Sequence, residues 1–160
     1  MRSFTTAVVL ALSLLAAPAL ASAQMAPPST KAHIYDEKAD PWKDIAAALR
    51  QAKREHKRVI LDFGGDWCGD CQVLDIYFKQ SPNKELLAKH FVLVHVWIGR
   101  MDQHVDVADK YQIPLKKGVP ALAVVDANGK LLYAQKTGEF ESMRSMNASS
   151  VTEFLNKWKI

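Results

Sequence analysis

Residues 59–74 read VILDFGGDWCGDCQVL and contain the only two cysteines of the 160-residue chain, Cys68 and Cys71. An apolar run leads into the pair and a helical pattern follows it, which predicts a strand, a short turn and a helix that begins at the first cysteine. The first turn of a helix presents unpaired N–H groups and the positive end of the helix dipole, so a thiol placed there loses its proton more readily. The thiolate is the nucleophile of disulfide chemistry. We therefore expect a dithiol–disulfide exchange enzyme in which Cys68 attacks and Cys71 resolves the mixed disulfide.

Two other uses of the cysteine pair fit the sequence less well. A structural disulfide stabilises a protein mainly by closing a loop, and a bridge across two intervening residues constrains very little of the unfolded chain. A zinc site needs four ligands. Beyond the cysteines the chain offers five histidines without paired spacing, at His33, His56, His90, His95 and His104. The sequence therefore predicts no metal and no other cofactor, and we expect His95, inside an apolar run, to be a core histidine with satisfied polar atoms.

The bulk composition is that of an ordinary globular domain. The chain is 49% apolar and 24% charged, and its formal net charge at pH 7 is +4. Charges of both signs alternate along the sequence, with no basic block and no interleaving of basic and aromatic residues. These features argue against nucleic-acid binding and predict a solvated surface of mixed charge.

The N-terminus has the parts of a secretory signal peptide. A short positive region precedes an apolar run over residues 7–17, and small residues stand before Gln24. The run is shorter than the roughly 20 residues that cross a bilayer. We therefore predict a signal peptide over residues 1–23, export to the bacterial periplasm and no membrane span in the mature chain. Residues 24–39 are predicted to be a flexible leader or an arm over the surface, and residues 40–160 a single domain.

The rest of the chain alternates helical and strand patterns. Asp40 is expected to cap the first helix, and a capping box that begins at Ser150 is expected to start the last one. The first strand is apolar apart from Asp62, which indicates burial on both faces. Helical patterns cover residues 41–55, 69–79, a short segment after 81, residues 103–111 and the segment after 150, and strand patterns cover 58–63, 91–98, 121–125 and 131–134. Three tryptophans on apolar faces are expected in the core, namely Trp42, Trp97 and Trp158.

Three separated features give residues 40–160 a resemblance to the thioredoxin superfamily. The motif Trp67-Cys68-Gly69-Asp70-Cys71 after a strand is similar to the family's Trp-Cys-Gly-Pro-Cys. Asp62 stands where thioredoxins carry a buried acid, and Gly118-Val119-Pro120 opens a strand like the family's cis-proline loop. The signal peptide and the short insertion Leu115-Lys116-Lys117 are typical of the exported branch, which includes disulfide isomerases. The resemblance implies an α/β fold with a mixed central sheet of about four to five strands and helices on both faces.

The resemblance also implies roles for single residues. Asp62 would relay a proton to or from Cys71 during resolution, with a structural, hydrogen-bonded acid as the alternative. Pro120, in a cis peptide bond with Val119, would leave the Val119 backbone free to pair with an extended substrate beside the cysteines. Trp67 would cover the first cysteine as part of a substrate platform, with a packing role as the alternative.

The sequence departs from the family pattern at two positions. Asp70 stands where proline is usual between the cysteines, and Ile98 stands where thioredoxins place a lysine near the buried acid. The expected redox-tuning residues are Asp66, Gly69 and Asp70. Because like charges disfavour a thiolate, Asp66 and Asp70 predict a Cys68 thiol that is less acidic than in strongly oxidising relatives, and a more reducing couple. The effect is lost if both carboxylates are solvated and screened.

These observations predict an exported thiol–disulfide oxidoreductase on the reductase or isomerase side. Its partners would be protein thiols and disulfides, together with a redox partner that recycles the dithiol. Two alternatives stay open. One is a non-catalytic thioredoxin-like module that binds a peptide near Val119, and the other is a dedicated electron shuttle to one partner, for example in cytochrome maturation.

Overall fold

The computed structural model describes residues 31–160. The predicted signal peptide, residues 1–23, and the predicted leader up to residue 30 lie outside the described residues. None of the helices within residues 31–160 is long and apolar enough to cross a membrane.

A four-stranded mixed sheet forms the centre of the domain. Its strands are β1 (Arg58–Gly64), β2 (Phe91–Trp97), β3 (Ala121–Val125) and β4 (Leu131–Ala134). They follow the order β2-β1-β3-β4, so β2 and β4 lie at the edges. β1 runs parallel to β2 and antiparallel to β3, and β3 pairs antiparallel with β4. The parallel pair needs a crossover connection, whereas the last two strands are joined by a short turn over residues 126–130.

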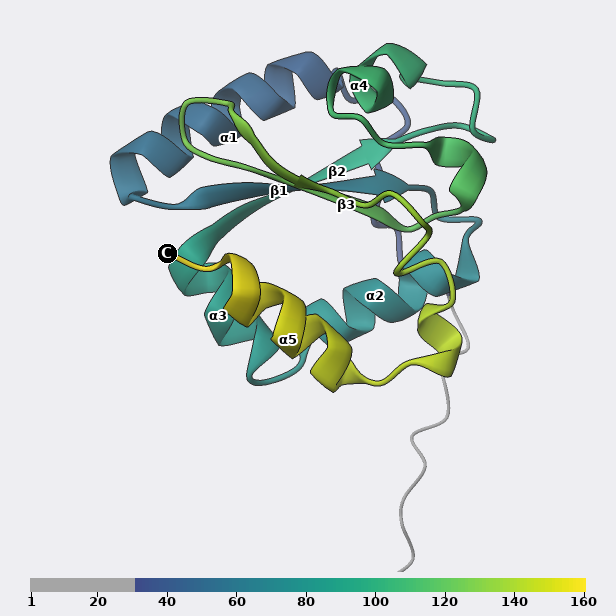
Figure 1. Cartoon of the computed structure of the whole chain (residues 1–160). Coiled ribbons are helices and arrows are strands. Elements are labelled where there is room, and N and C mark those ends of the chain that lie inside the picture. The colour runs from purple at the N-terminus through teal and green to yellow at the C-terminus, as the bar shows by residue number, and fades with distance from the viewer. Residues whose placement is uncertain (1–30) are drawn as a thin grey trace, which may run out of the picture.

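Helices cover both faces of this sheet. They are α1 (Pro41–Glu55), α2 (Gly69–Lys79), α3 (Asn83–His90), α4 (Val105–Lys110) and α5 (Ala148–Trp158), with two short 3-10 helices, η1 (Leu115–Lys117) and η2 (Met143–Ser145). α1 and α4 lie on one face, and α2, α3 and α5 lie on the other (Figure 1). This arrangement confirms the predicted mixed sheet flanked by helices on both faces.

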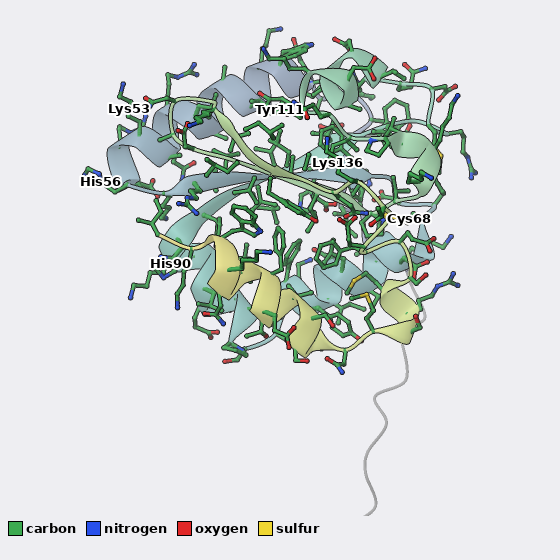
Figure 2. All side chains as sticks on the ribbon, in the orientation of Figure 1. Lys53, His56, Cys68, His90, Tyr111 and Lys136 are labelled. Atoms are coloured by element: carbon green, nitrogen blue, oxygen red, sulfur yellow. A yellow bond between two sulfur atoms is a disulfide. The ribbon has the colours of Figure 1, made fainter. Side chains whose placement is uncertain are left out.

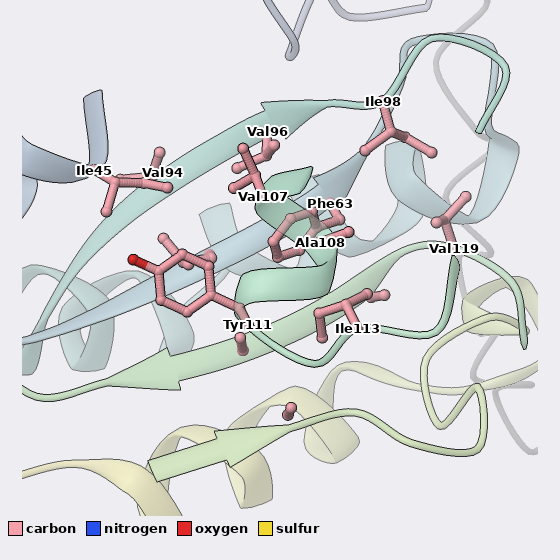
Figure 3. Packing of buried hydrophobic residues seen from close by; sticks show 14 of the residues in the cluster. Ile45, Phe63, Val94, Val96, Ile98, Val107, Ala108, Tyr111, Ile113 and Val119 are labelled. Atoms are coloured by element: carbon pink, nitrogen blue, oxygen red, sulfur yellow. The ribbon is translucent and has the colours of Figure 1, made fainter. Parts of the chain in front are cut away.

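Two apolar clusters fill the space between the sheet and the helices. The cluster beneath α1 and α4 includes Leu61 and Val96 (Figure 3). The cluster toward α2, α3 and α5 includes Ile60 and Leu122. Because neighbouring residues of β1 enter different clusters, both faces of this strand are buried, as its uninterrupted apolar run predicts.

The first helix begins where the sequence predicts, but its buried stripe is displaced. The Asp40 carboxylate accepts the backbone N–H groups of Trp42 and Lys43, and Pro41 occupies the first helical position. The inward positions are taken by Ile45 and Ala48. Trp42 is instead 42% exposed and donates its indole N–H to Asp106 at 2.8 Å, so the prediction that it belongs to the core is wrong. Two other tryptophans, Trp97 and Trp158, are half-buried and pack against the two clusters.

The segment before α1 is attached to the domain. Tyr35 is fully buried in the cluster beneath α1, and Ile34 packs against the same cluster. The Asp66 carboxylate accepts the backbone N–H groups of both residues, at 2.9 and 3.0 Å. Residues 34–35, within the segment predicted to be a flexible leader or an arm over the surface, therefore pack against the domain.

The last helix starts earlier than predicted. Asn147, not Ser150, is its N-cap, and the Asn147 side chain accepts the backbone N–H of Ser149 at 3.1 Å. Ser150 lies inside the first turn, so the predicted capping box does not form the start of the helix. Asparagine is as good an N-cap as serine, and it stands three residues earlier in the chain.

This assignment can be tested by replacing each candidate cap with alanine. Asn147→Ala removes the acceptor of the first-turn N–H group and is expected to lower the free energy of unfolding by about 1 kcal/mol. Ser150→Ala is the matched control and is expected to change it by less than about 0.5 kcal/mol, as for a substitution without a cap. Urea unfolding of both variants measures the difference, and a larger loss for Ser150→Ala would show that the cap is misassigned.

Candidate active site

The two cysteines stand at the end of a central strand and at the start of α2. Cys68 is the N-cap of α2, and its Sγ accepts the backbone N–H of Cys71 at 3.1 Å. The pair forms a disulfide with a Cα–Cα distance of 5.2 Å. Cys68 is 6% exposed and Cys71 only 1%, so an incoming sulfur reaches Cys68 more readily than Cys71. The predicted strand, turn and helix are therefore present, with Cys68 at the positive end of the helix dipole.

The Val119–Pro120 segment faces Cys68 from the start of β3. The peptide bond between Val119 and Pro120 is cis. The Cys68 Sγ lies 3.4 Å from the carbonyl oxygen of Val119, and both residues of the segment are buried. In a reduced Cys68 the thiol would donate to this carbonyl. The structure thus brings together the cysteine motif and the loop that the sequence places about fifty residues later.

Trp67 precedes Cys68 and packs against the segment that follows β2. Its indole N–H donates to the carbonyl oxygen of Gly99 at 2.6 Å, and the Arg100 guanidinium lies over the ring at 5.0 Å from its centroid. The half-buried ring is also packed beside Gly65, where an added Cβ would meet the indole nitrogen at 2.5 Å. A depression of about 370 Å³ opens next to it and is lined in part by Trp97 and Arg100. Trp67 is therefore a fixed wall beside this depression.

Asp70, between the two cysteines, forms an ion pair with Arg144 of η2. The Asp70 carboxylate accepts the Arg144 backbone N–H at 2.8 Å and the Nε–H at 3.1 Å, and the guanidinium Nη2 lies 3.0 Å from Oδ2. Asp70 is 8% exposed, whereas the Arg144 side chain is largely exposed and borders Gly69. Asp70 is thus neither solvated nor an unbalanced negative charge beside Cys68. The sequence analysis missed Arg144, because 73 residues separate it in the chain from the position that it neutralises.

The Asp66 carboxylate also has hydrogen-bond partners nearby. Besides the backbone N–H groups of Ile34 and Tyr35, its carboxylate contacts the His33 ring Nδ1 at 2.6 Å. Burial raises the pKa of Asp66, but the hydrogen bonds from Ile34, Tyr35 and His33 outweigh it and lower the pKa below its ordinary value. Asp66 therefore stays ionised and anchors the segment before α1 to the turn that precedes the cysteines.

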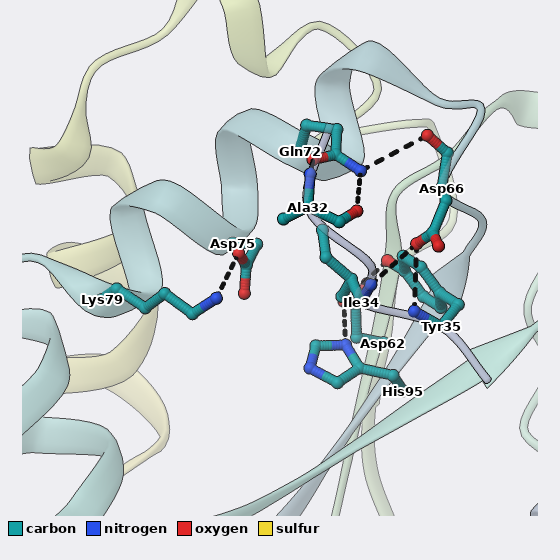
Figure 4. Close-up of polar contacts among 9 residues, drawn as sticks. All are labelled: Ala32, Ile34, Tyr35, Asp62, Asp66, Gln72, Asp75, Lys79 and His95. Carbon is teal, nitrogen blue, oxygen red and sulfur yellow. Dashed lines mark hydrogen bonds and ion pairs between the residues drawn. The ribbon is translucent and has the colours of Figure 1, made fainter. Parts of the chain in front are cut away.

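The predicted buried acid is present and has two side-chain partners. Asp62 is 1% exposed, and its Oδ2 accepts the Tyr35 hydroxyl at 2.8 Å and lies 2.9 Å from His95 Nδ1 (Figure 4). Burial raises the pKa of Tyr35, and the charge and hydrogen bond of Asp62 raise it further. Burial lowers the pKa of His95, but the hydrogen bond and charge of Asp62 overcome this effect, and the pKa of His95 lies above its ordinary value of 6.5. His95 Nδ1 thus has Asp62 as its partner, as predicted for a satisfied histidine, but the side chain is only half-buried at the edge of the sheet and is not part of the core.

Sequence reasoning found Asp62 but not the partners that hold it. The parallel register pairs Asp62 with His95 on the neighbouring strand. Aligning the two apolar runs from their first residues would have found this contact. Tyr35 gave no signal, because the segment around it has no periodicity.

The cysteines and histidines do not form a metal site in the described part of the chain. Within residues 31–160 no group of three or more histidine, cysteine or acidic side chains is placed to hold a metal ion. Cys68 lies at the end of the molecule opposite His56 and His90 (Figure 2).

Comparisons with known proteins agree with this geometry. The Thioredoxin-like family model matches residues 40–127. A solved structure of disulphide isomerase from Xylella fastidiosa Temecula1 is 36% identical, with a TM-score of 0.75, and the alignment covers 80% of this chain and 98% of that one. The disulfide bond reductase DsbH of Chlamydia pneumoniae is 30% identical over 105 residues, which cover 57% of this chain and 59% of the relative. Thioredoxin-3 of Dictyostelium discoideum is 32% identical over 60 residues, which cover 38% of this chain and 55% of that protein, so the match spans little more than half the length of these two relatives.

The Asp70–Arg144 pair predicts opposite effects for two charge removals. Asp70→Asn leaves the guanidinium beside Cys68 and is expected to lower the apparent pKa of the reduced Cys68 thiol. Arg144→Gln leaves the carboxylate and is expected to raise it. Each change should be about 0.5 to 1 pH unit, below the 1 to 3 units of a contacting charge. The measurement is the rate of Cys68 alkylation against pH at low salt, and shifts in the same direction would show that a loop movement, not charge, is responsible.

The raised pKa of His95 predicts a pH-dependent contribution to stability. Such a group stabilises the fold fully below its unfolded-state pKa, and the contribution is lost as the pH rises through the folded-state pKa. His95→Asn should therefore lower the free energy of unfolding more at pH 6 than at pH 9. Urea unfolding of the oxidised protein at both pH values measures this, with His56→Asn as the control, because His56 is exposed and sits in a left-handed conformation that asparagine tolerates. An equal loss at both pH values would contradict the assignment.

Proposed function

The chain belongs to the Thioredoxin-like family, and from this premise we propose that it is a thiol–disulfide oxidoreductase acting on protein substrates through Cys68 and Cys71. The observation that carries the proposal is the unequal exposure of the two sulfurs at the start of α2. Cys68 is the more accessible and caps the helix, whereas Cys71 is sealed behind it. This order matches a nucleophile followed by a resolving thiol.

The reaction proceeds in two exchanges. The reduced Cys68 thiolate attacks one sulfur of a substrate disulfide, and the other substrate sulfur leaves as a thiolate. Cys71 then loses its proton and attacks Cys68 Sγ, which breaks the mixed disulfide and releases the second substrate thiolate. The substrate gains two electrons, the enzyme forms the Cys68–Cys71 disulfide, and a thiol-bearing redox partner must restore the dithiol. When another thiol of the same substrate instead attacks the substrate sulfur of the mixed disulfide, a new substrate disulfide forms, Cys68 leaves as a thiolate, and the outcome is isomerisation rather than reduction.

The Val119–Pro120 segment and Trp67 would shape the substrate site. The Val119 carbonyl lies against the Cys68 sulfur and precedes the cis Pro120, so an extended substrate segment would pair with the backbone at Val119. Trp67 would form one wall of the substrate site, and its ring is held by the Gly99 carbonyl and the Arg100 guanidinium. Asp62 would be the proton acceptor of the resolving step.

The relatives support chemistry on the reductase or isomerase side, since one is named a disulfide bond reductase and another a disulphide isomerase. Export to the bacterial periplasm fits the positive start, the apolar run and the small residues over residues 1–23. The proposed mature chain begins at Gln24.

Two cysteine variants test the proposed function. Cys68→Ser removes the nucleophile and is expected to reduce thiol-dependent insulin reduction to the uncatalysed rate. Cys71→Ser leaves the nucleophile without its resolving partner, so a mixed disulfide between Cys68 and the substrate should accumulate and be released by added dithiol. Ser150→Ala, in the first turn of α5, is the control and should retain the wild-type rate. Activity that persists in Cys68→Ser would refute the proposal, and peptide binding without turnover in the wild type would favour the non-catalytic module.

A further inference from the structure

A row of polar groups begins beside Cys71 and ends at the molecular surface. A Cβ built on Gly64 would lie 2.5 Å from the Tyr35 hydroxyl oxygen and 2.8 Å from Cys71 Sγ, so these two atoms flank the same glycine. The Tyr35 hydroxyl donates to Asp62 Oδ2, and the same oxygen contacts His95 Nδ1 on the other side (Figure 4). The row therefore runs from the resolving cysteine through tyrosine and carboxylate to histidine.

Exposure rises along this row. Cys71, Tyr35 and Asp62 are at most 1% exposed, whereas the His95 side chain is 25% exposed. His95 also lines an open groove of about 490 Å³ between α1 and the edge strand β2. One end of the row is therefore closed, and the other end meets solvent.

We propose that Tyr35 positions Asp62, and that His95 carries the proton that Asp62 takes from Cys71 to the groove. The inference rests on the proposed function and adds the route of its proton. In the resolving step the Cys71 thiol gives its proton to the Asp62 carboxylate, and the Cys71 thiolate forms the S–S bond with Cys68 as the substrate thiolate leaves. The proton on Asp62 then passes to His95 and from there to water in the groove.

The free oxygen of Asp62 supports its part in this route. Oδ2 is engaged by Tyr35 and His95, but Oδ1 is buried and has no hydrogen-bond partner among the described residues. A buried polar atom without a partner is costly in a folded protein, and a catalytic role is one of the reasons for which such an atom is kept. Oδ1 is therefore an acceptor that no described residue engages, and the proposal assigns it the proton from Cys71, whose own side chain is sealed from solvent.

The other charged groups around the row affect the pKa values of Tyr35 and His95. Asp66 follows β1, and Asp75 and Lys79 face the row from α2, where they form an ion pair at 2.6 Å. Burial, then Asp62, and then the Asp75 and Asp66 carboxylates hold the pKa of Tyr35 well above its ordinary value, so the hydroxyl stays protonated and orients Asp62. Burial and, less strongly, Lys79 lower the pKa of His95, but Asp62 and then Asp75 raise it by more, so the pKa of His95 lies above its ordinary value.

The route makes the segment before α1 part of the active site. Tyr35 is held in place by Asp66, the residue next to Trp67 in the cysteine motif. An element outside the sheet and its helices thereby supplies a side chain to the proton path.

The test separates the two exchanges with a chromogenic disulfide, 5,5′-dithiobis(2-nitrobenzoate). The reduced full-length mature chain releases one thionitrobenzoate when Cys68 attacks and a second when Cys71 resolves the mixed disulfide. Tyr35→Phe is expected to leave the first phase unchanged and to slow the second about tenfold at pH 7, below the 10²–10⁴-fold of a complete acid–base group. Tyr111→Phe is the matched control, because Tyr111 is also buried but is the C-cap of α4 (Figure 3), and it should leave both phases unchanged.

His95→Asn keeps a side-chain N–H near Asp62 but cannot titrate. In the wild type the second phase should change with pH through the pKa of His95, above 6.5, and in His95→Asn this change should disappear. His56→Asn should keep the wild-type profile.

If the second phase of Tyr35→Phe has the wild-type rate and the pH profile of His95→Asn is unaltered, the proton route is wrong, although the proposed oxidoreductase function is not affected. If the first phase is absent in the wild type, the proposed function itself fails. Should Tyr35→Phe not fold, the His95→Asn profile decides alone.

Discussion

The structure depends on one constraint, which is that β1 is buried on both faces and ends at Gly64, one short turn before the cysteines. Ile60 and Leu61 point into different apolar clusters, and the strand has a hydrogen-bonded neighbour on each side. A strand fixed in this way gives the following turn little freedom. Cys68 therefore occupies a defined position at the N-terminus of α2, where unpaired backbone N–H groups favour a thiolate.

The same constraint explains which parts of the molecule could be predicted from the sequence. Continuous or periodic apolar runs marked α1, β1, β3 and β4 nearly to the residue, because packing against a core leaves a pattern in the chain. The cysteines and the Val119–Pro120 loop were found because each is a local motif. Trp42 was assigned to the core wrongly, since a helical pattern defines an apolar face only to within about one residue position and Ile45 and Ala48 fill the inward stripe. Arg144 and Tyr35 could not be found, because their contacts with the site join segments distant in the chain and neither lies in a periodic run.

The electrostatic setting of Cys68 differs from the one that residue types alone suggest. Asp66 and Asp70 stand on either side of the first cysteine, which predicts a surplus of negative charge. In the folded protein Asp70 is balanced by Arg144, and Asp66 is bound by His33 and by backbone N–H groups. Neither carboxylate is free, and neither is simply screened by solvent. The charge that acts on the thiolate therefore depends on η2 and on the segment before α1, both of which are separate from the cysteine motif in sequence.

A carboxylate in the middle of a sheet would normally destabilise the fold, since an ionised and unpaired buried group costs several kcal/mol or more. The chain meets this cost by placing Asp62 one strand from the sheet edge. From there the register brings His95 of the edge strand alongside it, and Tyr35 closes the other side. Both partners engage the same oxygen, and the second oxygen is left open. If Asp62 served stability alone, a second partner on Oδ1 would be the better arrangement. The one-sided pairing is what a group needs when it must hold its position and still accept a proton.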